Sequence, residues 1–177
     1  MYRDVIKVAK SLYRSAYPVP SVWLAYKLGR LTGKLSDLTI SSMGYSGRDY
    51  CHRFRDDMEL GVLITCLLTR TYLDLRAAGT EIAAIRFEDL VADPTESIRR
   101  ILEFCRLPEE LTKHAVRGME VDSQRNSIIA KSIIGHLPEP ELTPEAEARA
   151  NEWLRKYGLP LVGEEYLIDG TITAKNR

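Results

Sequence analysis

AIRFEDLVADPTESIRRILEFC, residues 84–105, is the stretch that decides the fold. It begins inside a continuous apolar run over 82–85, which does not alternate with polar residues. A run of this kind is typical of a strand that is covered on both faces in an α/β sheet. We therefore predict a short buried strand over 81–87, followed by a tight acidic turn around Glu88 and Asp89.

A helix follows the turn and begins abruptly. Asp93 is a good N-cap residue, Pro94 suits the first helical position, and Glu96 completes a pattern like a capping box. Apolar residues then recur at i, i+3, i+4 and i+7, namely Ile98, Ile101, Leu102 and Cys105. This spacing predicts a helix with one apolar stripe that faces the core.

As a string, the segment from Phe87 to Phe104 resembles the E-D-L…D-P…I…I-L-x-F segment found late in sulfotransferases. These enzymes move a sulfuryl group from 3′-phosphoadenosine 5′-phosphosulfate (PAPS). The start of the chain adds a second match. Members of the family carry an Arg at the end of a core strand and a Ser eight residues later on the next helix, and both bind the nucleotide's 3′-phosphate. Arg3 and Ser11 stand at that spacing.

The chemistry of Arg3 and Ser11 fits the role that the resemblance implies. Arg offers a planar fork of donors to phosphate oxygens, and Ser adds a hydroxyl donor. The alternative for each residue is a solvated position on an ordinary helix, because short motifs also match by chance. The later match at 87–104 favours the binding role.

The resemblance implies an α/β fold of the P-loop-like sulfotransferase type, here a helix-rich C-terminal portion with a truncated parallel sheet. It covers roughly the C-terminal half to two-thirds of such an enzyme. The sequence holds neither GxxxxGK[ST] nor P-K-[ST]-G-[ST]-[ST]. We expect the family's phosphate loop and general base to lie upstream of Met1, and we assign no catalytic residue. We predict a single, N-terminally incomplete domain over 1–168 and a loosely held tail over 169–177.

Further nucleotide contacts follow from the resemblance. Ser123, Gln124 and Arg125 lie where the family has a late loop over the 3′-phosphate, and they offer several side-chain donors. A polar loop before the next helix is the alternative. The R-K-G-x-x-G-D-W sequence of cytosolic sulfotransferases is absent, which favours a divergent or carbohydrate-type branch. Phe87 is expected to pack near the nucleotide base, where many relatives carry Tyr.

Glu88 and Asp89 could suggest a catalytic pair of carboxylates. Adjacent residues of a strand point to opposite faces, so we expect no shared acid–base role for them. We expect them instead to hold the turn, by accepting hydrogen bonds from the backbone or from a partner such as Arg86.

The remaining pattern predicts helices over 4–16, from Ser21 to about Gly33, over 57–78, from Pro108 to about Met119, and over 143–157. Apolar stripes are expected on these helices, including Val5, Val8, Ala9 and Leu12 on the first. Residues 34–54 are expected to be mostly loop. In related enzymes such loops shape the acceptor site, so position alone makes five residues candidates: Tyr45, Arg48, Tyr50, His52 and Arg53. For each of them taken singly, an ordinary position in a polar surface loop is the favoured alternative.

Composition narrows the classes of partner. The chain has 177 residues and equal numbers of basic and acidic side chains, 25 of each, so a general nucleic-acid binder is disfavoured. Its three Cys and three His show no metal-ligand spacing, and no apolar run is long enough to span a bilayer. Cys66 and Cys105 are expected in the core. The compartment, cytoplasmic or Golgi lumen, stays open, as does the oligomeric state.

The leading hypothesis is a PAPS-dependent sulfotransferase that acts on a hydroxyl or amine of a small-molecule or carbohydrate acceptor. The competing hypothesis is a catalytically inactive helical scaffold or interaction module derived from such an enzyme, which the missing phosphate loop favours. A P-loop nucleotide kinase is disfavoured by the lack of GxxxxGK[ST].

Overall fold

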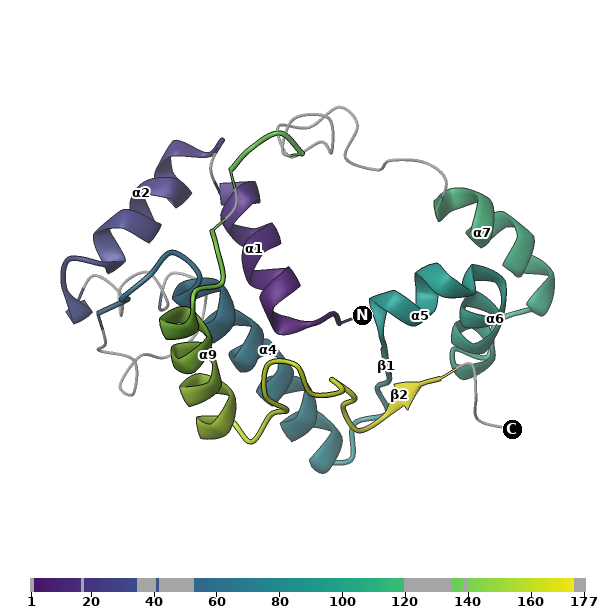
Figure 1. The fold of residues 1–177 in the computed structure, drawn as a ribbon. Helices are drawn as coiled ribbons and strands as arrows, with labels where there is room; N and C mark the ends of the chain where they lie inside the picture. The colour runs from purple at the N-terminus through teal and green to yellow at the C-terminus, as the bar shows by residue number, and fades with distance from the viewer. Residues whose placement is uncertain are drawn as a thin grey trace. The chain divides into compact units, whose positions relative to one another are not determined.

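Helices dominate the part of the chain that the structure, a computed structural model, describes: residues 2–16, 18–34, 41, 53–119, 135–138 and 140–173 (Figure 1). A small parallel sheet of two strands accompanies them. The predicted α/β class is confirmed at this level. The chain forms two compact units, the first comprising Met1–Asp4, Arg70–Ser123 and Glu165–Arg177, the second Val5–Thr69 and Gln124–Glu164. The prediction of one domain over 1–168 stays a prediction.

The first unit is built on three parallel segments. β1 (Ala84–Ile85) pairs with β2 (Thr171–Ile172), with Ala84 opposite Thr171. Tyr2 joins the other edge of β1 through an isolated parallel bridge to Arg86. The Tyr2 N–H donates to the Ile85 carbonyl at 2.9 Å, and the Tyr2 carbonyl accepts from the Phe87 N–H at 2.8 Å. The buried strand is therefore confirmed, but it is shorter than the predicted 81–87.

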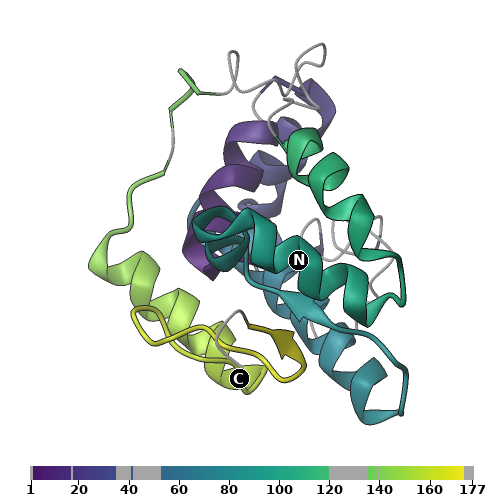
Figure 2. The same cartoon turned by 90° about the vertical axis from the view of Figure 1, so that its right-hand side faces the viewer.

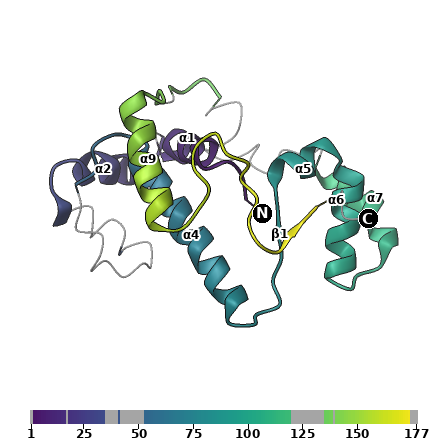
Figure 3. The same cartoon turned by 60° about the horizontal axis from the view of Figure 1, so that its bottom comes forward.

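Four helical segments follow β1: α5 (Phe87–Ala92), α6 (Pro94–Phe104), the 3-10 helix η1 (Glu109–Leu111) and α7 (Thr112–Met119). The tight turn predicted around Glu88 and Asp89 is wrong, because both residues lie in the first turn of α5. α6 packs against α5, η1, α7 and β2, and Figures 1 and 3 show this cluster of helices beside the strands.

The predicted start of α6 is confirmed, whereas the apolar stripe predicted on this helix is buried only in part. The Asp93 carboxylate accepts from the Glu96 N–H at 3.0 Å, and Pro94 opens the helix. Ile98 and Leu102 are buried. Cys105 is exposed, which contradicts its predicted place in the core, because it is the residue after the last helical turn.

The C-terminal segment is held in the first unit. Arg76 pairs with Asp169 at 3.0 Å and also donates to the Ile82 carbonyl at 2.6 Å. The Tyr2 and Thr171 hydroxyls lie 2.8 Å apart. Gly170 has φ +73°, and a Cβ there would collide with the Arg76 guanidinium. These contacts involve the tail only as far as Thr173, and the loosely held tail over 169–177 stays a prediction.

The second unit contains α1 (Val5–Ala16), α2 (Pro20–Gly29), the first three turns of α4 (Glu59–Ala77), and α9 (Pro144–Lys156). These helices confirm four of the predicted ones, with small shifts of their ends. The predicted stripe of α1 is confirmed in part: Val5 and Ala9 are buried, whereas Val8 and Leu12 are only half-buried. Ile6, Tyr13 and Ala16 complete the buried face. Ser21 does not cap α2, since Val19 precedes the helix and Pro20 opens it.

Polar contacts join α4 to α9 within this unit. Glu59 is 4% exposed, and its carboxylate accepts from Trp153 Nε1 at 2.9 Å and from the Arg55 N–H at 2.6 Å. Asp56 caps the start of α4 and forms an ion pair with Arg149 at 2.8 Å. The segment after α9 turns back along that helix, where the Val162 N–H donates to Asn151 Oδ1 (Figure 2).

Candidate functional site

Arg3 lies at the carboxyl edge of the parallel segments in the first unit. It directly follows Tyr2, which is in register with Arg86, and Phe87 directly follows that bridge on the neighbouring segment. Parallel segments present their carboxyl ends at the same edge, which is where open α/β sheets bind ligands. Arg3 therefore stands after a strand-like segment, as the sequence predicted, and next to Phe87.

The Arg3 side chain contacts two residues of α5. Its Cζ atom lies 4.7 Å from the centroid of the Phe87 ring, a cation–π geometry. Its Nε atom lies 3.6 Å from Glu88 Oε1, and that nitrogen is buried with no hydrogen-bond acceptor among the described residues. The Arg3 side chain is nevertheless 40% exposed, so part of the guanidinium faces solvent. A cation on an aromatic ring, with open donors, can bind an anion attached to a planar group.

Arg86 is occupied by its own partners. Its Nη2 and Nε atoms donate to the two oxygens of Asp89 at 2.7 and 3.1 Å, and Glu165 lies 3.6 Å away. The hydrogen bonds to Asp89 raise the Arg86 pKa above its ordinary value, although burial opposes this. The predicted role of Asp89, as an acceptor from Arg86, is confirmed. The argument from opposite strand faces is wrong, because Glu88 and Asp89 are helical and each engages a different arginine.

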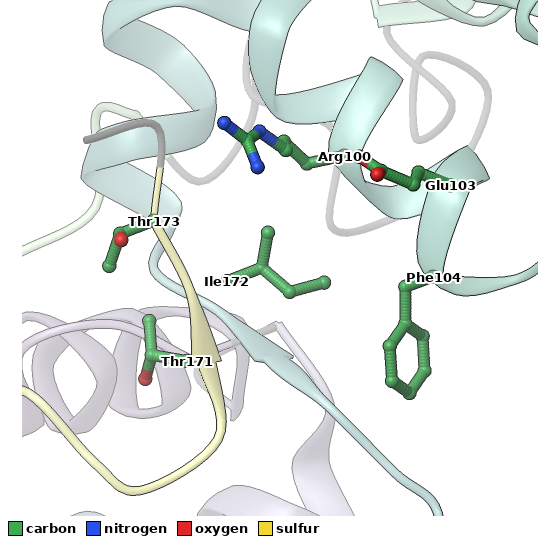
Figure 4. A pocket seen from close by; sticks show the side chains of 6 residues that line it. All are labelled: Arg100, Glu103, Phe104, Thr171, Ile172 and Thr173. Carbon is green, nitrogen blue, oxygen red and sulfur yellow. The ribbon is translucent and has the colours of Figure 1, made fainter. Parts of the chain in front are cut away.

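A cavity of about 290 Å³ opens between α6 and β2 in the same unit (Figure 4). It is lined by Arg100, Glu103, Phe104, Thr171, Ile172 and Thr173. Ile172 projects toward α6, and the Thr173 hydroxyl is buried with no hydrogen-bond partner among the described residues. Arg100 is already paired with Glu96 at 2.9 Å, so the cavity offers little free charge.

The other predicted site residues lie in the second unit or outside the described residues. Ser11 is an exposed residue of α1 in the second unit. Ser123, Gln124 and Arg125 lie outside the described residues, as do the acceptor-loop candidates Tyr45, Arg48, Tyr50 and His52. Arg53 is described and exposed. Within the described ranges no group of His, Cys, Asp and Glu could hold a metal ion, and no helix has the length and apolarity to cross a bilayer.

Sequence reasoning did not find the pairing of Arg3 with Glu88, and no local pattern could have revealed it. The two residues are far apart in the chain and meet only because Tyr2 pairs with β1. Comparison with known proteins adds no family: no family model, no curated protein and no solved structure matches this chain.

Proposed function

We propose that this chain is a protein of the PAPS-dependent sulfotransferase family and that Arg3 binds the nucleotide. One observation carries the proposal: Arg3 follows a segment in parallel register with β1 and lies on the ring of Phe87. In the resemblance described above, these two residues bind the 3′-phosphate and pack near the base. An arginine and an aromatic ring at the carboxyl edge of parallel strands suit a phosphate joined to a planar base.

The reaction in this proposal transfers the sulfuryl group in line from PAPS to an acceptor hydroxyl or amine, possible acceptors being small molecules and carbohydrates. Arg3 contributes positive charge to the nucleotide phosphate and holds it in place, which is a binding and positioning role. Arginine stays protonated at all working pH values, so Arg3 is unsuited to remove the acceptor proton. No general base is assigned to this chain.

Calorimetric titration of the chain with adenosine 3′,5′-bisphosphate and with AMP tests the proposal. We expect the bisphosphate to bind more tightly, because AMP lacks the 3′-phosphate. Arg3→Ala should weaken bisphosphate binding about 10-fold, the lower end of the range for a charge-assisted contact, because the side chain is partly exposed.

Arg117→Ala is the matched control, since Arg117 is an exposed arginine of α7 in the same unit as Arg3. It should leave binding of both nucleotides unchanged. Equal binding of the two nucleotides, or an Arg3→Ala protein that binds like wild type, would contradict the proposal.

The second candidate function is a helical scaffold derived from such an enzyme. The contact between Arg3 and Glu88 favours a scaffold, because the Glu88 carboxylate already neutralises part of the arginine's charge. The absence of the phosphate-loop motif from the sequence also favours it. A scaffold would bind neither nucleotide, whereas the enzyme portion would bind the bisphosphate without turning over PAPS. Turnover in the ordinary range of about 1 to 1,000 per second would contradict both expectations.

A further inference from the structure

A second cavity, of about 440 Å³, lies in the second unit and is lined by Arg30, Arg53, Phe54 and Arg55. Three of these four residues are arginines. Its volume lies within the range of small-molecule pockets, about 300–1,000 Å³. The residues that line the pocket belong to the second unit, whereas Arg3, Phe87 and Glu88 belong to the first.

The arginines are held by the backbone around them. Phe54 is 1% exposed, and its N–H donates to the Gly29 carbonyl at the end of α2 at 3.1 Å. The next N–H, of Arg55, donates to the buried Glu59 carboxylate at 2.6 Å. With Phe54 directed into the core, Arg53 and Arg55 on either side of it are exposed. Both arginines line the pocket.

Arg30 also lines the pocket, and two contacts hold its side chain. Its Nη1 atom pairs with Asp57 at 3.0 Å, and its Nη2 atom donates to the Arg55 carbonyl at 3.4 Å. Lys27 shares the same carboxylate at 3.3 Å. A guanidinium with five N–H groups keeps donors available beyond these two contacts.

The acidic groups near the pocket are already engaged. Asp57 is shared by two cations, Asp56 is paired with Arg149, and Glu59 accepts from Trp153 and from a backbone N–H. Within the described part of the chain, the side chains of Arg53 and Arg55 have no acidic partner. Among the described residues, the pocket therefore carries an excess of positive charge, on a chain whose formal net charge is zero.

We propose that this pocket binds a tetrahedral oxyanion, a phosphate or sulfate, borne by a small organic molecule. Guanidinium groups match such anions in charge and in the geometry of their paired N–H groups. The cavity is larger than the anion, so it also accommodates part of the group that carries it. This proposal does not depend on the nucleotide site.

Calorimetric titration of the chain at low salt tests the proposal with four probes: inorganic phosphate, inorganic sulfate, glucose 6-phosphate and glucose. We expect the three anions to bind and glucose not to bind. Glucose 6-phosphate should bind more tightly than inorganic phosphate if the pocket takes the organic part. The comparison of phosphate with sulfate identifies the preferred anion.

Arg53→Gln and Arg55→Gln should each weaken anion binding about 10-fold, with circular dichroism confirming that each variant is folded. Arg117→Gln, on α7 of the first unit, is the matched control and should bind as wild type does. No anion binding by wild type, or an equal loss in Arg117→Gln, would overturn the proposal.

Discussion

Gly61 of α4 lies against Ala9 of α1 so closely that a Cβ atom on Gly61 would stand 2.8 Å from Ala9 Cα. The nearest atoms include the Ala9 backbone, which has little freedom to move. The first three turns of α4 and the middle of α1 are buried at this crossing. The contact is thus possible only because the residue on α4 has no side chain.

Gly61→Ala should destabilise the protein by about 1–3 kcal/mol, because overpacking outweighs the higher helix propensity of Ala. Urea unfolding followed by circular dichroism measures this. Gly118→Ala is the matched control, since Gly118 is a helical glycine of α7 with no atom within 4 Å of the added Cβ. That variant should be more stable by up to about 1 kcal/mol. A Gly61→Ala protein as stable as wild type would contradict the tight crossing.

Trp153→Phe should destabilise the protein by about 1–3 kcal/mol, because the buried Glu59 carboxylate loses the indole N–H as a donor. Urea unfolding of the single variants and of the double variant with Glu59→Leu tests the interaction as a double-mutant cycle. In the Glu59→Leu background, where the carboxylate is absent, Trp153→Phe should lower the free energy of unfolding by clearly less. Equal costs in the two backgrounds would show that the hydrogen bond does not contribute.

The caps of α6 and α9 were predictable because capping is local, whereas the cap expected at Ser21 was not formed. Asp93 and Thr143 accept the hydrogen bonds that their positions before Pro94 and Pro144 predicted. The end of the strand β1 was not predictable from the sequence, because side-chain pairing decides whether the strand continues beyond Ile85. Arg86 meets Asp89 three residues on, a spacing that stabilises a helical turn and lets α5 begin at Phe87.

Tertiary contacts decided what the sequence patterns left open. On α1, Val5 and Ala9 are buried as predicted, and Ala9 meets Gly61. The sequence pattern did not show that Ile6 and Tyr13 would be buried in place of Val8 and Leu12. The Arg3 neighbourhood likewise depends on a pairing across the chain, between Tyr2 and Arg86. Resemblance indicated that Arg3 ends a strand, whereas its contact with Glu88 follows only from three-dimensional structure.

Glu96 makes stability depend on pH. Hydrogen bonds from Arg99 and then Arg100 lower its pKa from 4.5 to about 2. A carboxyl whose pKa is lower in the folded state stabilises that state above its ordinary pKa, and this contribution is lost as pH falls toward 2. Glu96→Gln should therefore lower the urea midpoint at pH 7, with a difference from wild type that shrinks between about pH 4.5 and 2.

Glu110→Gln is the control for this measurement, because Glu110 forms no ion pair with the described residues and should show no such difference. High salt should also reduce the effect of Glu96→Gln, since its partners are near the surface. A difference between Glu96→Gln and wild type that is constant from pH 7 to 2 would contradict the assigned cause.

The two described cysteines should differ sharply in reactivity. Burial raises the pKa of Cys66 to about 12, whereas Cys105 is exposed. Thiolate is the reactive form, so a disulfide reagent at pH 8 should modify Cys105 quickly and Cys66 only after unfolding. The measurement uses a Cys51→Ser background, with Cys105→Ser as the comparison. Rapid labelling of Cys66 in the folded protein would contradict its burial.

Glu88→Gln should strengthen binding of adenosine 3′,5′-bisphosphate if Arg3 is the residue that receives its 3′-phosphate. The carboxylate lies 3.6 Å from the arginine and competes with the phosphate for the same charge. An ion pair near the surface is worth up to about 1 kcal/mol, so removing it should raise the affinity up to about 5-fold. Calorimetric titration measures the gain, and Glu110→Gln should show none. The gain must vanish in an Arg3→Ala background, because the freed charge is then absent. A gain that persists there would assign the effect to general electrostatics and remove Glu88 from the site.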